Sequence, residues 1–211
     1  MRGPDIPVDE NPLAPLPASV SPIDHERAQR AVAELLDALG VDRSSPGLRD
    51  TPRRVASAYA EMLTPTPFNA TTFPNDGDYD QLVVVSDIRF SSLCEHHMLP
   101  FVGVAHVGYL PGDRIIGLSK LPRIVEQRAR SLQVQERLTT EIADWLEQTL
   151  QPRAVGVVLE ANHMCMALRG VRQANSLTTT SALRGLLRED PRTRKEFFDL
   201  IGRRGPSTGT C

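Results

Sequence analysis

Hydrophobic residues recur every three or four positions in two stretches near the start of the chain, which is the period of an α-helix. Ser21 and Pro22 suit the N-cap and first position of a helix, and the first apolar stripe then runs until Gly40. Thr51 and Pro52 repeat this start signal before the second stripe. The pattern therefore predicts two helices ahead of the main core.

From Asp80 onward Val and Ile become frequent and apolar positions alternate with others, as is typical of strands. We expect strands at residues 82–90, 102–110, 154–161 and 164–171. Helices are predicted between the two pairs of strands and near the end of the chain, at residues 119–132, from 134 onward and from Asp190. Strand pairs separated by helices favour an α+β fold with antiparallel sheet over a doubly wound parallel fold.

The same pattern divides the chain into four parts. Residues 1–21 are predicted to be a disordered Pro-rich arm, because prolines among small and polar residues cannot bury enough apolar surface to fold. Residues 22–78 form an N-terminal helical segment, and residues 79–202 form the main domain. A flexible tail, residues 203–211, ends at Cys211.

Charge and composition narrow the classes of function. The formal net charge is -2, which argues against a protein that binds nucleic acid by broadly neutralising phosphates. No apolar run approaches the ~20 residues needed to cross a bilayer, and the first residues lack the pattern of a signal peptide. The 3 cysteines do not suit a disulfide framework. We therefore expect a cytoplasmic protein without membrane or nucleic-acid partners.

Two short polar islands inside apolar strands bring cysteine and histidine together. Cys94 and His97 are three residues apart, so that one tight turn can present both to a metal, and thiolate with imidazole is a ligand set that zinc prefers. In the predicted last strand, alternate residues place His163, Cys165 and Arg169 on one face. The pattern predicts a zinc site that uses cysteines from both islands.

The same residues allow two other interpretations. Each cysteine taken singly is more often a small buried hydrophobe, but the neighbouring histidines make metal binding the better explanation. A closed structural site would recruit His96 or His163 as a fourth ligand. The surplus of candidate ligands and the nearby arginine favour an open position for water instead. His96 and His163 are then candidates for moving protons, whereas His25 and His106 have no such neighbours.

A second cluster combines a helix start with two cations. Ser119, Lys120 and Arg123 follow Gly117, and free backbone N–H groups at a helix start attract phosphate. An ordinary cap followed by a solvated basic face explains the same residues. The segment at residues 133–137 opens another helix, and by itself it says little.

Together these motifs resemble the GTP cyclohydrolase I family, zinc enzymes that open the imidazole ring of GTP. The matching segments are residues 92–97, 117–120, 133–139, 163–166 and 169–172, with weaker similarity at 47–56 and 180–182. The resemblance implies a tunnelling fold, in which antiparallel sheets carry helices on one face. It also implies a homodecamer of two stacked pentamers with active sites between subunits.

Carried over residue by residue, the resemblance implies four groups of site residues. The zinc ligands are Cys94, His97 and Cys165. The catalytic residues are His96, His163 and Ser119. The guanine edge is held by Glu136, with Gln135 beside it. The triphosphate is bound by Ser119, Lys120, Arg123 and Arg169, with Arg54 as a weaker match.

The implied reaction is hydrolytic opening of the GTP ring at C8, with His96 protonating a ring nitrogen. Formate is then released and the ribose carbons rearrange and reclose as 7,8-dihydroneopterin triphosphate, the first step of tetrahydrofolate and pterin biosynthesis. One alternative is the nitrile reductase of queuosine synthesis, which has the same fold but no zinc, and Cys94 with His97 and Cys165 argues against it. Another is a non-catalytic, zinc-stabilised assembly or binding protein.

Overall fold

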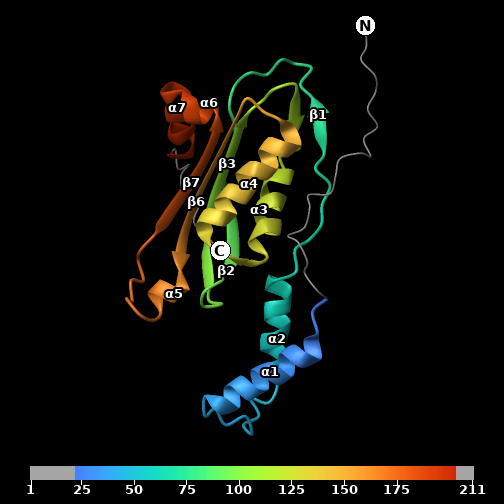
Figure 1. Ribbon diagram of the computed structural model, residues 1–211, viewed down its shortest axis with the longest axis vertical. Coiled ribbons are helices and arrows are strands. Elements are labelled where there is room, and N and C mark those ends of the chain that lie inside the picture. Colours follow the sequence, from blue (N-terminus) through green and yellow to red (C-terminus); the bar gives the residue numbers. More distant parts are fainter. Residues whose placement is uncertain (1–21, 203–211) are drawn as a thin grey trace.

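The computed structural model describes residues 22–202, and its sheet and helical body carry a separate pair of helices at one end (Figure 1). This pair consists of α1 (His25–Ala38) and α2 (Thr51–Met62). Helix α1 begins later than predicted, because Asp24 rather than Ser21 caps it, accepting a hydrogen bond from the Arg27 N–H at 2.9 Å. Helix α2 begins at Thr51 with Pro52 in its first turn, one residue earlier than predicted, because Asp50 and not Thr51 takes the N-cap position.

The body is built on a five-stranded sheet in the order β5-β2-β3-β6-β7. Its strands are β2 (Val83–Cys94), β3 (Pro100–Leu110), β5 (Leu132–Gln133), β6 (Ala154–His163) and β7 (Thr178–Gly185). All neighbours are antiparallel except β2 and β5, which run parallel. A second, two-stranded sheet pairs β1 (Thr72–Pro74) with β4 (Arg114–Ile116). The predicted α+β fold with antiparallel sheet is confirmed.

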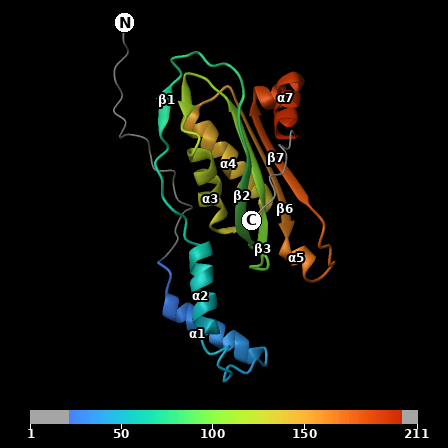
Figure 2. The same ribbon diagram turned by 180° about the vertical axis from the view of Figure 1, so that it is seen from behind.

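Two long helices, α3 (Lys120–Ala129) and α4 (Gln135–Leu150), cover one face of the sheet (Figures 1 and 2). Alternate residues of β6 point toward them, so that Val155, Val157 and Leu159 are fully buried in the main core. Leu138 and Ile142 supply the facing stripe of α4 at helical spacing. No helix within residues 22–202 is long and apolar enough to span a membrane.

A smaller core on the opposite face is covered by α6 (Leu186–Glu189) and α7 (Pro191–Gly202). The Phe197 ring of α7 is fully buried against Gly108 and Gly156, which face each other in neighbouring strands. A Cβ atom at either glycine would lie 2.9 Å from that ring, so glycine is needed at both positions for the close approach.

The structure corrects two predicted elements. The strand predicted at residues 164–171 is wrong: β6 continues to His163, a single helical turn α5 (Met164–Ala167) follows, and the last strand is β7. The alternation of methionines resembled a buried strand, but Leu168 is 69% exposed, and a short apolar run does not by itself distinguish helix from strand. The helix predicted at 119–132 ends at Ala129, because the following residues pair with β2. The predicted arm (1–21) and tail (203–211) lie outside the described residues.

Candidate metal centre

The end of β2 and the turn that follows it present the first two candidate ligands. Cys94 is the last residue of β2, and its backbone closes a tight turn by donating to the Leu99 carbonyl at 2.9 Å and accepting from the Met98 N–H at 2.8 Å. Met98 has a φ of 54°, the left-handed conformation that the sharp turn requires. Within this turn His97 places its Nδ1 3.8 Å from the Cys94 Sγ.

The third candidate ligand comes from α5, next to the same end of the sheet. His163 pairs with Phe101 near the start of β3, so the chain beyond β6 emerges beside the turn that carries His97. The helical turn α5 then brings Cys165 into place, and the ligand atoms of Cys94, His97 and Cys165 all lie within 4.8 Å of one another. The predicted grouping of these residues is therefore present, although the strand alternation that suggested it is not.

Electrostatics make this cluster a natural place for a cation. Burial, together with the neighbouring Cys94, raises the pKa of the Cys165 thiol. Two thiolates held this close repel each other unless a positive ion lies between them, and a coordinated metal ion keeps such thiols deprotonated. Within residues 22–202, the two thiols and one imidazole form a group that could hold a metal ion.

Two further histidines flank the cluster. His96 is exposed, with its Nδ1 3.9 Å from the Cys94 Sγ and its Nε2 3.7 Å from the Glu95 carboxylate. His163 is half-buried and stacks on the Phe101 ring, with centroids 4.7 Å apart and planes within 4°. Burial lowers the pKa of His163, and the Glu136 carboxylate acts in the opposite direction.

The start of α4 brings two predicted substrate residues to the cluster, facing in different directions. Glu136 is exposed beside His163. Gln135 is only 1% exposed, and its side chain turns into the protein, where its Oε1 lies 2.7 Å from His163 Nε2. Arg169 also reaches the cluster, with its Nη1 3.2 Å from His97 Nε2.

The residues predicted to bind phosphate at the start of α3 lie far from this cluster within one chain. They are Ser119, Lys120 and Arg123. The end of α3 lies beside β2, the strand that carries Cys94, since the Ala129 carbonyl accepts a hydrogen bond from Ser92 Oγ at 2.6 Å. At a rise of about 1.5 Å per residue, the start of α3 is roughly 14 Å farther along, near β1 and β4 (Figure 1). Ser119 occupies the N-cap position but makes no side-chain capping hydrogen bond.

Arg54, the weakest match among the residues predicted to bind phosphate, lies on α2. It is exposed, and its guanidinium is 3.8 Å from the Asp50 carboxylate. The predicted phosphate contacts are thus divided among three places in one chain.

Sequence reasoning missed the residues that hold in place the turn carrying Cys94 and His97. Glu95 pairs with Arg137 at 2.6 Å, and the Glu95 N–H donates to the Gln133 carbonyl at 3.0 Å. Arg137 also donates to Gln133 Oε1 at 2.9 Å. These contacts tie the turn to the start of α4. The sequence signals this pair only by the opposite charges of Glu95 and Arg137, which are 42 residues apart.

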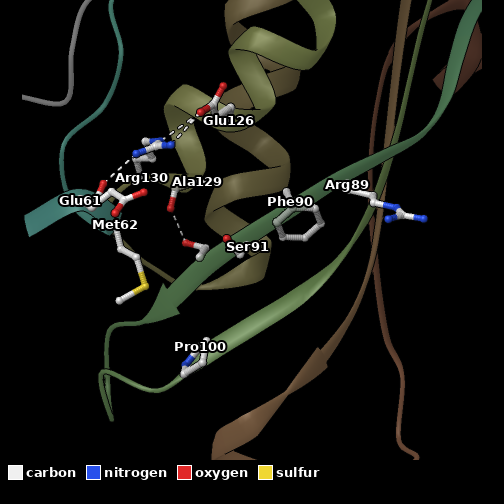
Figure 3. A pocket seen from close by; sticks show the side chains of 10 residues that line it. Glu61, Met62, Arg89, Phe90, Ser91, Pro100, Glu126, Ala129 and Arg130 are labelled. Atoms are coloured by element: carbon white, nitrogen blue, oxygen red, sulfur yellow. Dashed lines mark hydrogen bonds and ion pairs between the residues drawn. The ribbon is translucent and has the colours of Figure 1, made fainter. Parts of the chain in front are cut away.

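A cavity of about 480 Å³ is lined by other residues than those of the cluster, and Figure 3 shows the side chains around it. It is bounded by the end of α2, the end of α3 and the strand residues before Cys94, and the cluster residues do not line it. Arg130 spans it, donating to the Glu61 carbonyl at 2.7 Å and pairing with Glu126 at 2.9 Å. The concentration of titratable groups at the cluster, and not this cavity, marks the candidate site.

Comparison with known proteins agrees with the motif resemblance. Residues 28–202 match the family described as GTP cyclohydrolase I. The chain is 50% identical over 179 residues to GTP cyclohydrolase 1 of Sulfurihydrogenibium sp. (strain YO3AOP1), covering 85% of this chain and 96% of that one. It is 52% identical over 188 residues to GTP cyclohydrolase 1 of Streptomyces avermitilis, with coverage of 87% and 93%.

Among solved structures, the chain is similar to one titled as the archaeosine synthase QueF-Like in the apo form. The TM-score is 0.42 and the identity 15%, over 50% of this chain and 94% of that chain. A likeness this low has no bearing on function or assembly.

Proposed function

The chain belongs to the GTP cyclohydrolase I family, and on that premise we propose that its Cys94, His97 and Cys165 hold a catalytic zinc ion beside a binding site for GTP. The activity of the family is the conversion of GTP to 7,8-dihydroneopterin triphosphate with release of formate. The observation that carries this assignment is the meeting of the three candidate ligands with His96, His163 and Glu136 at one end of the sheet.

The donor set fits zinc. Two thiols and one imidazole are ligands that zinc prefers, and a catalytic zinc site uses three protein ligands and leaves one position open. When bound, zinc supplies Lewis-acid activation of water, whose pKa it lowers to roughly 7. Cys94 and Cys165 are free thiols, and a reducing compartment keeps thiols in that state. We therefore place the protein in the cytoplasm.

The residues around the ligands are proposed to bind and protonate the substrate. His96 is exposed beside Cys94, so its imidazole is free to protonate a ring nitrogen as the imidazole ring of GTP opens. The exposed carboxylate of Glu136 has two oxygens that can accept the paired N1–H and N2–H donors of guanine. Arg169 adds a positive charge on the same side for the phosphates.

The predicted phosphate-binding residues at the start of α3 support a site shared with a second copy of the chain. Ser119, Lys120 and Arg123 lie along α3 away from the metal cluster, yet none of these side chains has a hydrogen-bonding or ionic partner within residues 22–202. The outer edge of β7 is likewise unpaired among the described strands, which leaves it open to a neighbouring sheet. We therefore propose sites shared between subunits, in the homodecamer of two pentamers that the family resemblance implies.

The proposed function is tested by incubating the purified, zinc-loaded protein with GTP. We expect both formate and, after oxidation and dephosphorylation, fluorescent neopterin. Formate without neopterin would restrict the activity to ring opening. Neither product from a zinc-replete oligomer would favour the alternative, a non-catalytic zinc-stabilised binding protein.

His96→Ala is expected to lower turnover by about 100-fold to 10,000-fold while zinc stays bound, because a positioned proton donor contributes on that order. Formate release and zinc content per chain are measured together. His25→Ala, an exposed position on α1, is the matched control and should change neither. Loss of zinc from His96→Ala would instead identify His96 as a fourth ligand of a closed structural site, and full activity would remove it from proton transfer.

A further inference from the structure

The Gln135 side chain is buried at the start of α4, with its amide nitrogen facing backbone carbonyl groups. Its Nε2 lies 3.1 Å from the Leu159 carbonyl oxygen and 2.9 Å from that of Thr178. Carbonyl oxygens only accept hydrogen bonds, so the end of the amide that faces them must be the NH₂ group. The amide oxygen must therefore point the other way.

The Gln135 oxygen points at the imidazole of His163, 2.7 Å from its Nε2. An amide oxygen has no hydrogen to donate, so the hydrogen in this contact must belong to His163 Nε2. In the neutral imidazole, Nδ1 is then the nitrogen with the free lone pair. The two carbonyl groups of the fold thus determine, through Gln135, which nitrogen of His163 carries hydrogen.

Two threonine hydroxyls hold the amide in this orientation. Thr139 Oγ1 donates to the Gln135 backbone carbonyl at 2.7 Å, so the hydrogen in its 2.6 Å contact with Thr180 Oγ1 comes from Thr180. Thr180 Oγ1 is then left as an acceptor 3.1 Å from Gln135 Nε2, so that the two amide hydrogens are shared among this hydroxyl and the two carbonyl oxygens. A flipped amide would set its oxygen against two carbonyl oxygens, and stacking on Phe101 restrains the ring itself.

We propose that Gln135 is a positioning residue that fixes the tautomer and orientation of His163, and not a contact for guanine. Every polar atom of its side chain is used inside the protein, which leaves none for a substrate. The inference rests on the proposed function in one respect: His163 presents its Nδ1, and not its Nε2, to the substrate. It deepens that function by separating Gln135 from its neighbour Glu136.

A double-mutant cycle tests whether Gln135 acts through His163. Gln135→Leu is expected to lower kcat by about 10-fold to 100-fold with little change in the KM for GTP, the size of effect known for the loss of a partner that orients a metal-ligating histidine. In a His163→Ala background, the same substitution should cause no further loss. Gln127→Leu is the matched control, because Gln127 is also 1% exposed but its side chain, among residues 22–202, bonds only to the Thr66 carbonyl. A raised KM with unchanged kcat, or an equal loss in both backgrounds, would overturn the proposal.

Thr180→Val provides a milder variant if Gln135→Leu does not fold. It keeps the side-chain shape and removes one of the contacts of the Gln135 amide, so its smaller loss of kcat should also vanish in the His163→Ala background. A loss that persists there would contradict the proposal.

The tautomer itself can be observed without turnover. Solid-state NMR of the zinc-loaded protein labelled with [15N]histidine should show His163 as one tautomer with hydrogen on Nε2, and a mixture in Gln135→Leu. His163→Ala identifies the signal. Hydrogen on Nδ1 in the unaltered protein would overturn the proposal, whereas absence of formate from GTP would defeat only the proposed function.

Discussion

Cys94→Ser is expected to lose its zinc and to turn over GTP at least about 1,000-fold more slowly than the unaltered protein. The serine hydroxyl does not ionise near neutral pH, so it replaces a thiolate ligand by a neutral oxygen. Only His97 and Cys165 would then remain of the three candidate ligands. Metal analysis of the purified protein and formate release from GTP measure the two effects.

The control for this substitution is Cys211→Ser, which changes the remaining cysteine of the chain and should keep both zinc and turnover. Because Cys94 is 6% exposed and serine is nearly the same size, circular dichroism should show the fold intact. A Cys94→Ser protein that kept its zinc would remove Cys94 from the ligand set. One that lost zinc but kept turnover would mean that the metal is structural.

The part of the candidate metal centre that Cys94 and His97 form could be predicted, because these two residues are close together in the sequence. Cys94 and His97 lie in one turn between two strands whose Val-rich pattern is plain in the sequence, and the structure places them as expected. The contribution of Cys165 was predicted for a reason that the structure overturns, since a helical turn, and not strand alternation, carries it to the cluster. The residue types predicted that Cys165 joins Cys94 and His97 even where the predicted backbone was wrong.

The direction in which Gln135 points could not be predicted from the sequence. It depends on contacts with Leu159 and Thr178, which follow it by 24 and 43 residues, and on the parallel pairing of β5 with β2 just before it. A two-residue strand such as β5 has too short a pattern to predict. From the sequence alone, Gln135 is a candidate for guanine binding only as the neighbour of Glu136, and nothing in the sequence shows that one side chain is buried and the other exposed.

The separation of the metal cluster from the start of α3 leads to the second large prediction. Cys94→Ser and Lys120→Ala should each be inactive alone, and equimolar co-assembly should restore about a quarter of the unaltered activity. In a site shared between copies, half of the clusters are intact, and half of those meet an intact Lys120 from another chain. The measurement is formate release after the two proteins are co-expressed and purified together through different tags.

The matched control for co-assembly is Cys94→Ser with His97→Ala, two changes in the same cluster, which should recover no activity because every cluster then lacks a ligand. Mixing oligomers of Cys94→Ser with oligomers of Lys120→Ala, assembled separately and without exchange of subunits, should likewise give no activity. If the site lay within one chain, Cys94→Ser and Lys120→Ala would also stay inactive together, because every chain would carry one broken half. Recovery of activity would therefore mean that Lys120 acts at the metal cluster of a neighbouring subunit, as expected for a residue that lies about a helix length away from the cluster of its own chain.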